Sequence, residues 1–526
     1  MQETEIKFYG HACILIRVGN TTVVTDPWFS KSGAFLASWF QFPDNTDLDL
    51  EPIRNANYIA ISHGHEDHFD RKFLKTIDPK VKIIIPQYGS SKLYEELQAL
   101  IPNEIIVAPT RETIQLGEGL TIIPVVQSVP AWEDCAYIFE TPMGVIADTN
   151  DLKVMAPDQE WIKSHFSVDY LFAQFSGASW HPHVYNYNEE TKVKKAHEKI
   201  KRKFESVRIL SESLGARWLI PSAGPPCFLD PAHFSLNFNE TSTFPDQREF
   251  YLYAKEFGFA DRVAVLLPGD IFDPDSDNTA QNEKNISHPA FVDKRSYLTQ
   301  YQANRLEVIT KEHKDIAEPE NELLEKARAY FQPLIASSGF FRQQIKGSLL
   351  LETQGGFPEK IIVNFADKMN PVRRPLPEDL PFYSLKTEAK FLNLVLEKKA
   401  EWESFFLSMR FRAERNPDAY NEAFVVFLKF ASPELFRNYE AWDRARKNDA
   451  TFILNHEGRE YKVQRYCPHA MADLSRGQVV DGNLVCPGHG WQFSLKDGCC
   501  IQNKSKINVC CQDKDNSEPQ ITLVDL

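Results

Sequence analysis

Several features that define other classes of protein are scarce or absent in this chain of 526 residues. No stretch approaches the roughly 18 consecutive apolar residues of a membrane-spanning helix, so no membrane partner is expected. Lysine and arginine total 59 against 73 aspartate and glutamate, which gives a net charge of −14. Binding to a nucleic-acid backbone needs a basic face instead. We therefore expect no nucleic-acid partner either.

Cysteine is also scarce. Nine cysteines are too few for a disulfide scaffold in a chain of this length. The N-terminal sequence MQETEIKFYGHACILIRV lacks the basic and apolar segments of a secretory signal peptide. These features predict a cytoplasmic protein with reduced thiols. Cys499, Cys500, Cys510 and Cys511 are expected to be small buried side chains.

Three regions of different character follow one another. Residues 1–275 alternate short β-runs with helical segments, which predicts an α/β domain that binds metal. Residues 276–431 predict a mixed α+β region packed on it, with a hairpin over 345–365, a helical stretch over 387–424 and no motif that indicates chemistry. Residues 432–526 return to short strands and Gly/Asp turns, which predict a compact all-β domain.

Two cysteine–histidine pairs in the last region carry the strongest signal. Cys467 and His469 are followed, after a short spacer, by Cys486 and His489. A Rieske [2Fe–2S] cluster is held in this way, with two thiolates on one iron and two imidazoles on the other. Zinc is the alternative, but zinc fingers usually pair cysteine with cysteine and histidine with histidine. Residues 432–526 resemble the Rieske ferredoxin family, in its ferredoxin and oxygenase type.

A second cluster, HGHEDH, follows a buried strand near the N-terminus. It places His63, His65, Asp67 and His68 within six residues, a density of ligand types that predicts metal binding. The pattern H-x-H-x-D-H, the GHA turn at residues 10–12 and the DPW motif at 26–28 resemble the metallo-β-lactamase superfamily, which implies an αββα fold. The resemblance also implies that His63 and His65 share one metal, that Asp67 and His68 hold another, and that Asp148 bridges them.

The sequence departs from that superfamily in its later histidines. Residues 124–134, where a third histidine is expected, contain none, and their carboxylates are Glu133 and Asp134. If one of these ligates, the first site has two histidines and one carboxylate, the set typical of oxygen-activating ferrous iron. The alternative is a degraded first site, with one metal or none bound there. His181, His183 and His233 are further candidates for metal or substrate binding.

The combination of a lactamase-like and a Rieske domain resembles one family, the CMP-N-acetylneuraminate hydroxylases. The segments FSGASWHPHVYNY, LIPSAGPP and WESFFLSMRFRAERNPDAYNEAF have similar counterparts there, so the resemblance spans much of residues 5–430. The order of modules differs, because the Rieske module comes first in that family. The resemblance implies reductive activation of O₂ at non-haem iron, with electrons supplied through the cluster.

The first hypothesis is therefore a Rieske-dependent monooxygenase. An external donor, a ferredoxin or cytochrome b5 with its NAD(P)H reductase, would reduce the cluster, and electrons would pass to one or two irons in the N-terminal site. There O₂ would hydroxylate a small molecule, for which a nucleotide-sugar-like compound is one candidate, with Asp67 and His68 as the catalytic residues. The second hypothesis is a hydrolase with two zinc ions and an accessory Rieske domain.

A basic segment over residues 192–203 allows two interpretations. KVKKAHEKIKRK contains lysine at 192, 194, 195, 199, 201 and 203, with Arg202. It could meet an acidic electron donor or a phosphate of the substrate. A solvated helix face is the simpler interpretation.

Overall fold

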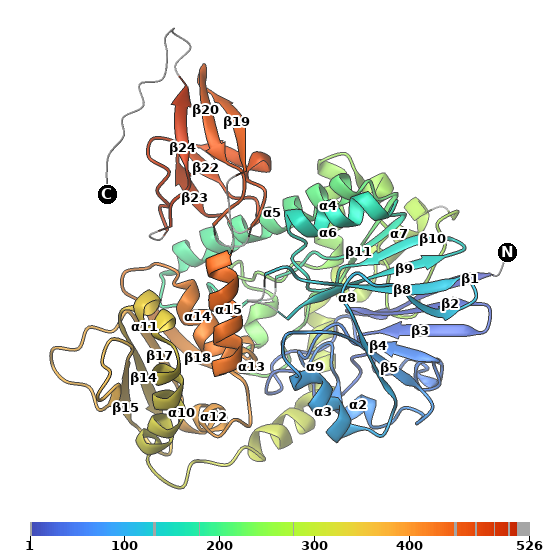
Figure 1. The fold of residues 1–526 in the computed structure, drawn as a ribbon. Helices are drawn as coiled ribbons and strands as arrows, with labels where there is room; N and C mark the ends of the chain where they lie inside the picture. Colours follow the sequence, from blue (N-terminus) through green and yellow to red (C-terminus); the bar gives the residue numbers. More distant parts are fainter. Residues whose placement is uncertain are drawn as a thin grey trace. The chain divides into compact units, whose positions relative to one another are not determined.

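The structure is a computed structural model that describes residues 3–129, 133–177, 179–276, 278–445, 450–468, 471–488, 490–502 and 505–512. The chain divides into two compact units, residues 1–444 and 445–526 (Figure 1). No helix in the described ranges is both long and apolar enough to cross a membrane.

Two β-sheets form the centre of the first unit. The first sheet has the strand order β13-β1-β2-β3-β4-β5-β6 and the second has the order β12-β11-β10-β9-β8-β7. The strands of the first sheet are β1 (Thr4–Gly10), β2 (Cys13–Val18), β3 (Thr21–Thr25), β4 (Tyr58–Ala60), β5 (Lys82–Pro86), β6 (Ile105–Ala108) and β13 (Ile271–Phe272). Those of the second sheet are β7 (Ile114–Gly117), β8 (Leu120–Val126), β9 (Cys135–Thr141), β10 (Gly144–Asp148), β11 (Tyr170–Gln174) and β12 (Trp218–Ser222).

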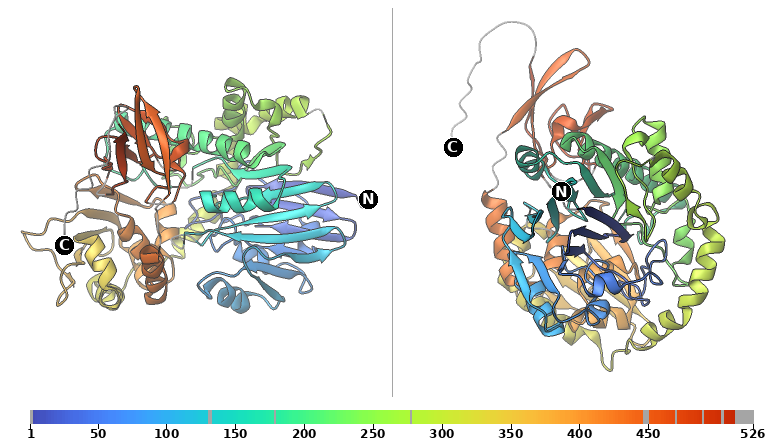
Figure 2. Two further views of the ribbon diagram at one scale, coloured as in Figure 1. Left: turned by 45° about the horizontal axis from the view of Figure 1, so that its top comes forward. Right: turned by 90° about the vertical axis from the view of Figure 1, so that its right-hand side faces the viewer.

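The two sheets lie face to face with helices outside them (Figures 1 and 2). Along β9, Tyr137 and Phe139 pack into the core between the sheets, whereas Ile138 packs outward beneath helices. This alternation is the two-residue period of a strand that is buried on both faces. The outer layers are α2 (Arg71–Leu74) and α3 (Lys92–Leu100) on the first sheet, and α4 (Ala156–His165), α5 (Glu189–Leu214) and α6 (Gln247–Glu256) on the second. The predicted αββα arrangement is confirmed.

Further helices complete the N-terminal part of the unit. They are α1 (Glu51–Arg54), η1 (Phe234–Asn237), η2 (Ala260–Arg262), α7 (Asn278–Ile286), α8 (Pro289–Val292) and α9 (Lys294–Lys314).

A third sheet, of order β16-β15-β14-β17-β18, occupies the later part of the same unit. Its strands are β14 (Ser348–Gln354), β15 (Lys360–Asn364), β16 (Val372–Arg373), β17 (Tyr383–Glu388) and β18 (Phe411–Arg415); the helices here are α10 (Leu323–Ser337), α11 (Gly339–Ile345), α12 (Ala389–Leu396), α13 (Trp402–Leu407), α14 (Glu422–Phe430) and α15 (Pro433–Ala445). β14 and β15 pair antiparallel, as the predicted hairpin requires.

The expectation of a continuous helical stretch over 387–424 is wrong at β18. Phe411 and Ala413 are buried while Arg412 and Glu414 are exposed, so this segment has the two-residue period of a strand and pairs with β17. Hydrogen bonds join the region to the lactamase-like part: Trp39 Nε1 donates to the Leu407 carbonyl at 2.9 Å. Arg410 donates to the Asp230 carboxylate at 2.6 Å.

The second unit is built from two small sheets, β19-β20-β24 and β21-β22-β23. Its elements are β19 (Thr451–His456), β20 (Arg459–Gln464), η3 (Leu474–Arg476), β21 (Gln478–Val480), β22 (Asn483–Val485), β23 (Gln492–Ser494) and β24 (Val509–Gln512). Adjacent strands in both sheets pair antiparallel, so the all-β prediction is confirmed for this unit.

Candidate metal centre and Rieske loops

The HGHEDH cluster lies where parallel strands of the first unit end. β3 and β4 run parallel; Asp26 directly follows β3, and residues 62–68 follow β4. β10 and β11 are also parallel; Asp151 follows β10, and Gln174 is the last residue of β11. Loops beyond the carboxyl ends of parallel strands are the usual place for a site in such sheets.

Asp26 organises two of the histidines. Its Oδ2 accepts from His68 Nδ1 at 2.8 Å and from the Ser62 hydroxyl at 2.5 Å. The Ser62 hydroxyl in turn lies 2.9 Å from His63 Nδ1, so that nitrogen donates to it. Each ring therefore carries its proton on Nδ1 and leaves Nε2 available as a metal ligand.

His68 is fully buried, and its Nε2 has no hydrogen-bond partner among the described residues. This nitrogen lies 3.5 Å from Asp151 Oδ1 and 3.9 Å from Asp67 Oδ2. Burial alone would lower the pKa of His68, but the carboxylates of Asp67, Asp151 and Asp26 raise it well above its usual value. Burial lowers the pKa of His63, which stays neutral.

His65 is held from the third-sheet region. Its Nδ1 lies 2.7 Å from His63 Nε2, and its Nε2 lies 3.1 Å from a Glu403 carboxylate oxygen. Lys429 lies 2.8 Å from the other Glu403 oxygen. A ligating histidine commonly donates its second ring N–H to a carboxylate, so Glu403 is placed to orient His65 with Nδ1 toward His63.

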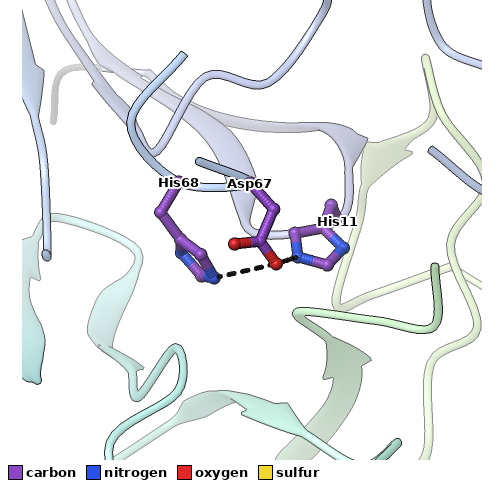
Figure 3. Close-up of side chains that lie close together, drawn as sticks. All are labelled: His11, Asp67 and His68. Atoms are coloured by element: carbon purple, nitrogen blue, oxygen red, sulfur yellow. Dashed lines mark hydrogen bonds and ion pairs between the residues drawn. The ribbon is translucent and has the colours of Figure 1, made fainter. Parts of the chain in front are cut away.

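Two groups of side chains have ligand atoms close enough to hold a metal ion. One is His63, His68 and Asp151; the other is His11, Asp67 and His68, shown in Figure 3. In the second group, His11 Nε2 lies 3.2 Å from Asp67 Oδ2. The Trp28 ring of the DPW motif packs edge-on against His11, with ring centroids 4.9 Å apart.

Asp148 lies beside these groups without joining them. It is buried next to Asp26, and both burial and that neighbouring charge raise the pKa of Asp148 well above its usual range. The residue that approaches the His68 ring is Asp151, three positions later, whose Oδ1 also accepts from the Gln174 amide at 2.5 Å. The VIADTND sequence contained both aspartates, and only Asp148 was predicted.

The remaining candidates lie outside both described groups. His183 Nε2 lies 3.0 Å from the Thr243 hydroxyl, and the His181 ring packs against Tyr185. His233 sits near Asp230 and Arg410. Burial raises the pKa of Glu133, and the nearby charges of Lys92 and Lys429 oppose this shift. The role in metal or substrate binding predicted for these four residues stays a prediction.

Besides Asp151, sequence reasoning missed four further residues of this site. His11 and Asp26 lie in the GHA and DPW motifs that carried the resemblance, but neither was assigned a function. Both have left-handed backbone, with φ of 53° and 36°, a conformation that side-chain-bearing residues adopt mainly at constrained sites. Glu403 and Lys429 gave no local signal, because their role depends on the packing of the third-sheet region against His65.

The site fits the metal that its sequence pattern implies. His68 Nε2 is fully buried, makes no hydrogen bond within the described residues and faces two carboxylates at 3.5 and 3.9 Å, an arrangement of donor atoms that a cation could share. Imidazole and carboxylate ligands suit iron and zinc alike. His63, His68 and Asp151 would hold one ion, with His65 beside His63 as a further candidate ligand and with His11 and Asp67 on the other side of His68.

Two loops of the second unit have the same backbone design. In the first, Cys467 N donates to the Ala472 carbonyl and Met471 N to the Cys467 carbonyl; in the second, Cys486 N donates to the Trp491 carbonyl and Gly490 N to the Cys486 carbonyl. The equivalent residues Met471 and Gly490 both have positive φ, 56° and 74°. Each loop thus closes a similar turn around its cysteine.

The loops approach each other closely at Gly488. A Cβ on this residue would lie 2.9 Å from the Ala472 Cβ and 3.9 Å from the Cys486 sulfur. Cys467 and Cys486 are completely buried, a fit for a cluster held between the loops. The predicted ligands His469 and His489 lie outside the described residues. Cys500 is buried as expected, but Cys499, Cys510 and Cys511 are exposed, so that expectation is wrong for these three.

Three known domains match successive parts of the chain. The chain matches a Beta-lactamase superfamily domain over residues 5–131, an Rv3818-like, SCP2-like domain over 323–445 and a Rieske [2Fe-2S] domain over 432–511. The fold and the matches together define a protein that combines a metallo-β-lactamase-fold domain with a Rieske domain.

Whole-chain relatives identify the family. A Rieske 2Fe-2S iron-sulfur protein of Mycolicibacterium smegmatis is 30% identical over 533 residues, covering 97% of this chain and 99% of that protein. The Rieske 2Fe-2S iron-sulfur protein Rv3818 of Mycobacterium tuberculosis is also 30% identical, covering 95% and 98%. The chain belongs to the family of these mycobacterial Rieske iron–sulfur proteins.

The predicted likeness to the sialic-acid hydroxylases is confirmed at lower identity. The cytidine monophosphate-N-acetylneuraminic acid hydroxylase of Xenopus laevis is 23% identical over 470 residues, which cover 85% of this chain and 76% of that enzyme. Among solved structures, CmlA, a diiron beta-hydroxylase from Streptomyces venezuelae, is 13% identical with a TM-score of 0.35, covering 52% of this chain and 54% of that one.

Proposed function

We propose that this protein is a Rieske-type non-haem iron oxygenase that hydroxylates a small-molecule substrate. The observation that carries the proposal is the convergence of His63, His68 and Asp151, whose ligand atoms lie close together around a buried His68 Nε2 that makes no hydrogen bond within the described residues. Two imidazoles and one carboxylate are the ligand set of oxygen-activating ferrous iron, and they leave positions open for other ligands. The Rieske domain and the hydroxylase relative support the same class of reaction.

Bound iron would supply the activation of O₂, chemistry that side chains alone do not provide. The chain's own residues prepare the site for it. Asp26 fixes the tautomers of His68 and, through Ser62, of His63, while Glu403 orients His65. Asp67 and His68 are the residues we assign to the reacting centre, and their burial keeps bulk water away from it.

In the second unit, Cys467, His469, Cys486 and His489 would hold the [2Fe–2S] cluster. Electrons would reach it from a ferredoxin or cytochrome b5 with an NAD(P)H reductase. The substrate is a small molecule, and the likeness to a nucleotide-sugar hydroxylase favours one of nucleotide-sugar type.

The test is metal analysis of protein purified without oxygen, together with electron paramagnetic resonance of the dithionite-reduced sample. Iron clearly above the two atoms of one cluster, with a Rieske signal, supports the oxygenase. Two irons with a Rieske signal and two zinc ions would instead favour a dinuclear hydrolase, for which His11, Asp67 and His68 offer the second position.

Two aspartate variants then test the assignment of ligands. Asp151→Asn should lose the additional iron and keep the Rieske signal, whereas Asp148→Asn should keep both because the raised pKa of Asp148 already favours its neutral form. The reverse result would return the ligand role to Asp148. Asp67→Ala should stop O₂-dependent hydroxylation with the cluster spectrum unchanged, and continued turnover would refute the role of Asp67.

A further inference from the structure

Helix α5 presents a row of lysines on one face. Lys192, Lys195, Lys199 and Lys203 are spaced three or four residues apart and are all partly buried, whereas Lys194 and Lys201 point away and are exposed. Residues at this spacing lie on the same side of a helix. The solvated-face interpretation therefore holds for only part of the basic segment.

The four partly buried lysines differ in their partners. Lys192 lies 4.0 Å from Glu189, and Lys195 lies 3.7 Å from Asp418. Lys199 and Lys203 form no ion pair with any carboxylate of the described residues. Lys199 Nζ donates to the His181 carbonyl at 3.0 Å, and Lys203 Nζ donates to the Gln174 side-chain oxygen at 2.6 Å. Both contacts are to neutral oxygens.

Ammonium groups removed from water without a counter-charge are costly. Burial and neighbouring cations together lower the pKa of Lys199 to about 7. Burial lowers the pKa of Lys203 to about 8, although the nearby Asp151 carboxylate opposes the shift. The ordinary remedy in a folded protein is an acidic side chain nearby, as Lys192 and Lys195 have. An anion from outside the chain would serve Lys199 and Lys203 in the same way.

Lys203 adjoins the metal centre, and Lys199 precedes it by one helical turn on the same face of α5. The Gln174 side chain that accepts from Lys203 donates through its other end to Asp151 at 2.5 Å. Asp151 lies 3.5 Å from His68 Nε2. Lys203 is therefore two hydrogen bonds away from a carboxylate of the metal group. One small molecule could contact the Lys203 ammonium group and the metal group at the same time.

We propose that Lys199 and Lys203 form an oxyanion subsite that binds a phosphate or carboxylate group of the substrate beside the metal centre. The inference rests on the proposed function, because it assumes that the substrate is positioned at that centre. Lysine suits this task as a compact charge whose three protons can each contact an oxygen. The subsite would fix the charged end of the substrate and leave the other end facing the metal.

The test is calorimetric titration of the full-length protein, with zinc in the metal centre and without reductant, using inorganic phosphate and acetate as separate probes. Wild type should bind one of them at one site per chain. Lys199→Gln and Lys203→Gln should each weaken that binding at least about tenfold, the effect of losing one hydrogen bond to a charged group. The probe that binds identifies the group as phosphate or carboxylate.

Lys201→Gln is the matched control, because it removes the same charge from the exposed side of the helix and should change binding less than twofold. Equal losses in all three variants would show a diffuse charge effect and overturn the subsite. Unchanged binding in Lys199→Gln and Lys203→Gln would place the anion on the metal alone and overturn the subsite. Absence of binding to the wild-type protein would overturn the subsite as well. Because no oxygen chemistry is measured, these outcomes are distinct from failure of the oxygenase proposal, which metal analysis detects.

Discussion

Glu403 offers a sharp test of how the metal centre is built, because it reaches His65 from the third-sheet region. Its carboxylate lies between His65 Nε2, at 3.1 Å, and Lys429 Nζ, at 2.8 Å. Glu403→Gln keeps the size of the side chain and removes its charge. The amide still fits between the two neighbours, but it no longer supports positive charge on the His65 ring when Nδ1 binds a metal.

The expected size of the effect follows from two independent estimates. A hydrogen bond to a charged group contributes about 1.5–3 kcal/mol, and the contact to His65 is of this kind. Replacing a residue that orients a metal ligand weakens metal binding by about 10–100-fold, which corresponds to about 1.4–2.7 kcal/mol. The agreement of the two ranges predicts that Glu403→Gln raises the dissociation constant of the centre by one to two orders of magnitude.

The assay is competition for the metal against a chelator of known affinity, with cluster absorbance recorded in parallel. Glu401→Gln is the control: Glu401 lies two residues away, is about half exposed at 49% and pairs with Lys92 at the surface, where ion pairs contribute little. Equal metal affinity in Glu403→Gln and wild type, or equal losses in both variants, would refute the role of Glu403.

Three further predictions concern other parts of the structure. Asp26→Asn should weaken metal binding at least about tenfold in the same assay, because Asp26 orients both His68 and, through Ser62, His63. The pKa of His68 is raised in the metal-free fold, so the stability contributed by its positive charge is fully present below about pH 6.5 and is lost as the pH rises through the raised pKa. Denaturant titrations over this pH range should show the loss of unfolding free energy in the metal-free protein and not in the His68→Asn variant. Arg410→Met should cost about 3–5 kcal/mol of unfolding free energy, since it leaves the buried Asp230 carboxylate without its arginine at 2.6 Å, and a cost below 1 kcal/mol would contradict this.

Much of the fold could be predicted because its signals are local. The short apolar run of β9 and the helical spacing of residues 192–203 are readable from neighbouring residues. The HGHEDH cluster is local too, and the structure brings His63, Asp67 and His68 to one place. The break at β18 was missed because FRAER is too short for its alternation to stand out from flanking helical sequence.

The choice between Asp148 and Asp151 shows where local reasoning stops. Asp148 ends β10, the position that the superfamily resemblance favours, and its side chain is buried beside Asp26. The three residues that follow carry Asp151 to the His68 ring. Their path depends on the turn after the strand, in which Asn150 has a φ of 45°, and no periodic pattern encodes it.

The third-sheet region had no sequence motif that indicated chemistry, yet it supplies the carboxylate that contacts His65. Lys429 from α14 neutralises that carboxylate, and Arg410 together with the Trp39 indole fixes the surrounding backbone to the lactamase-like part. Each of these contacts joins residues far apart in the sequence, so none is visible before folding. The superfamily's usual third histidine is missing from residues 124–134, and a neighbouring region of the same unit contributes to the centre instead. The metal centre is therefore a property of the whole first unit, and the lactamase-like strands alone would leave His65 without the partner that orients it.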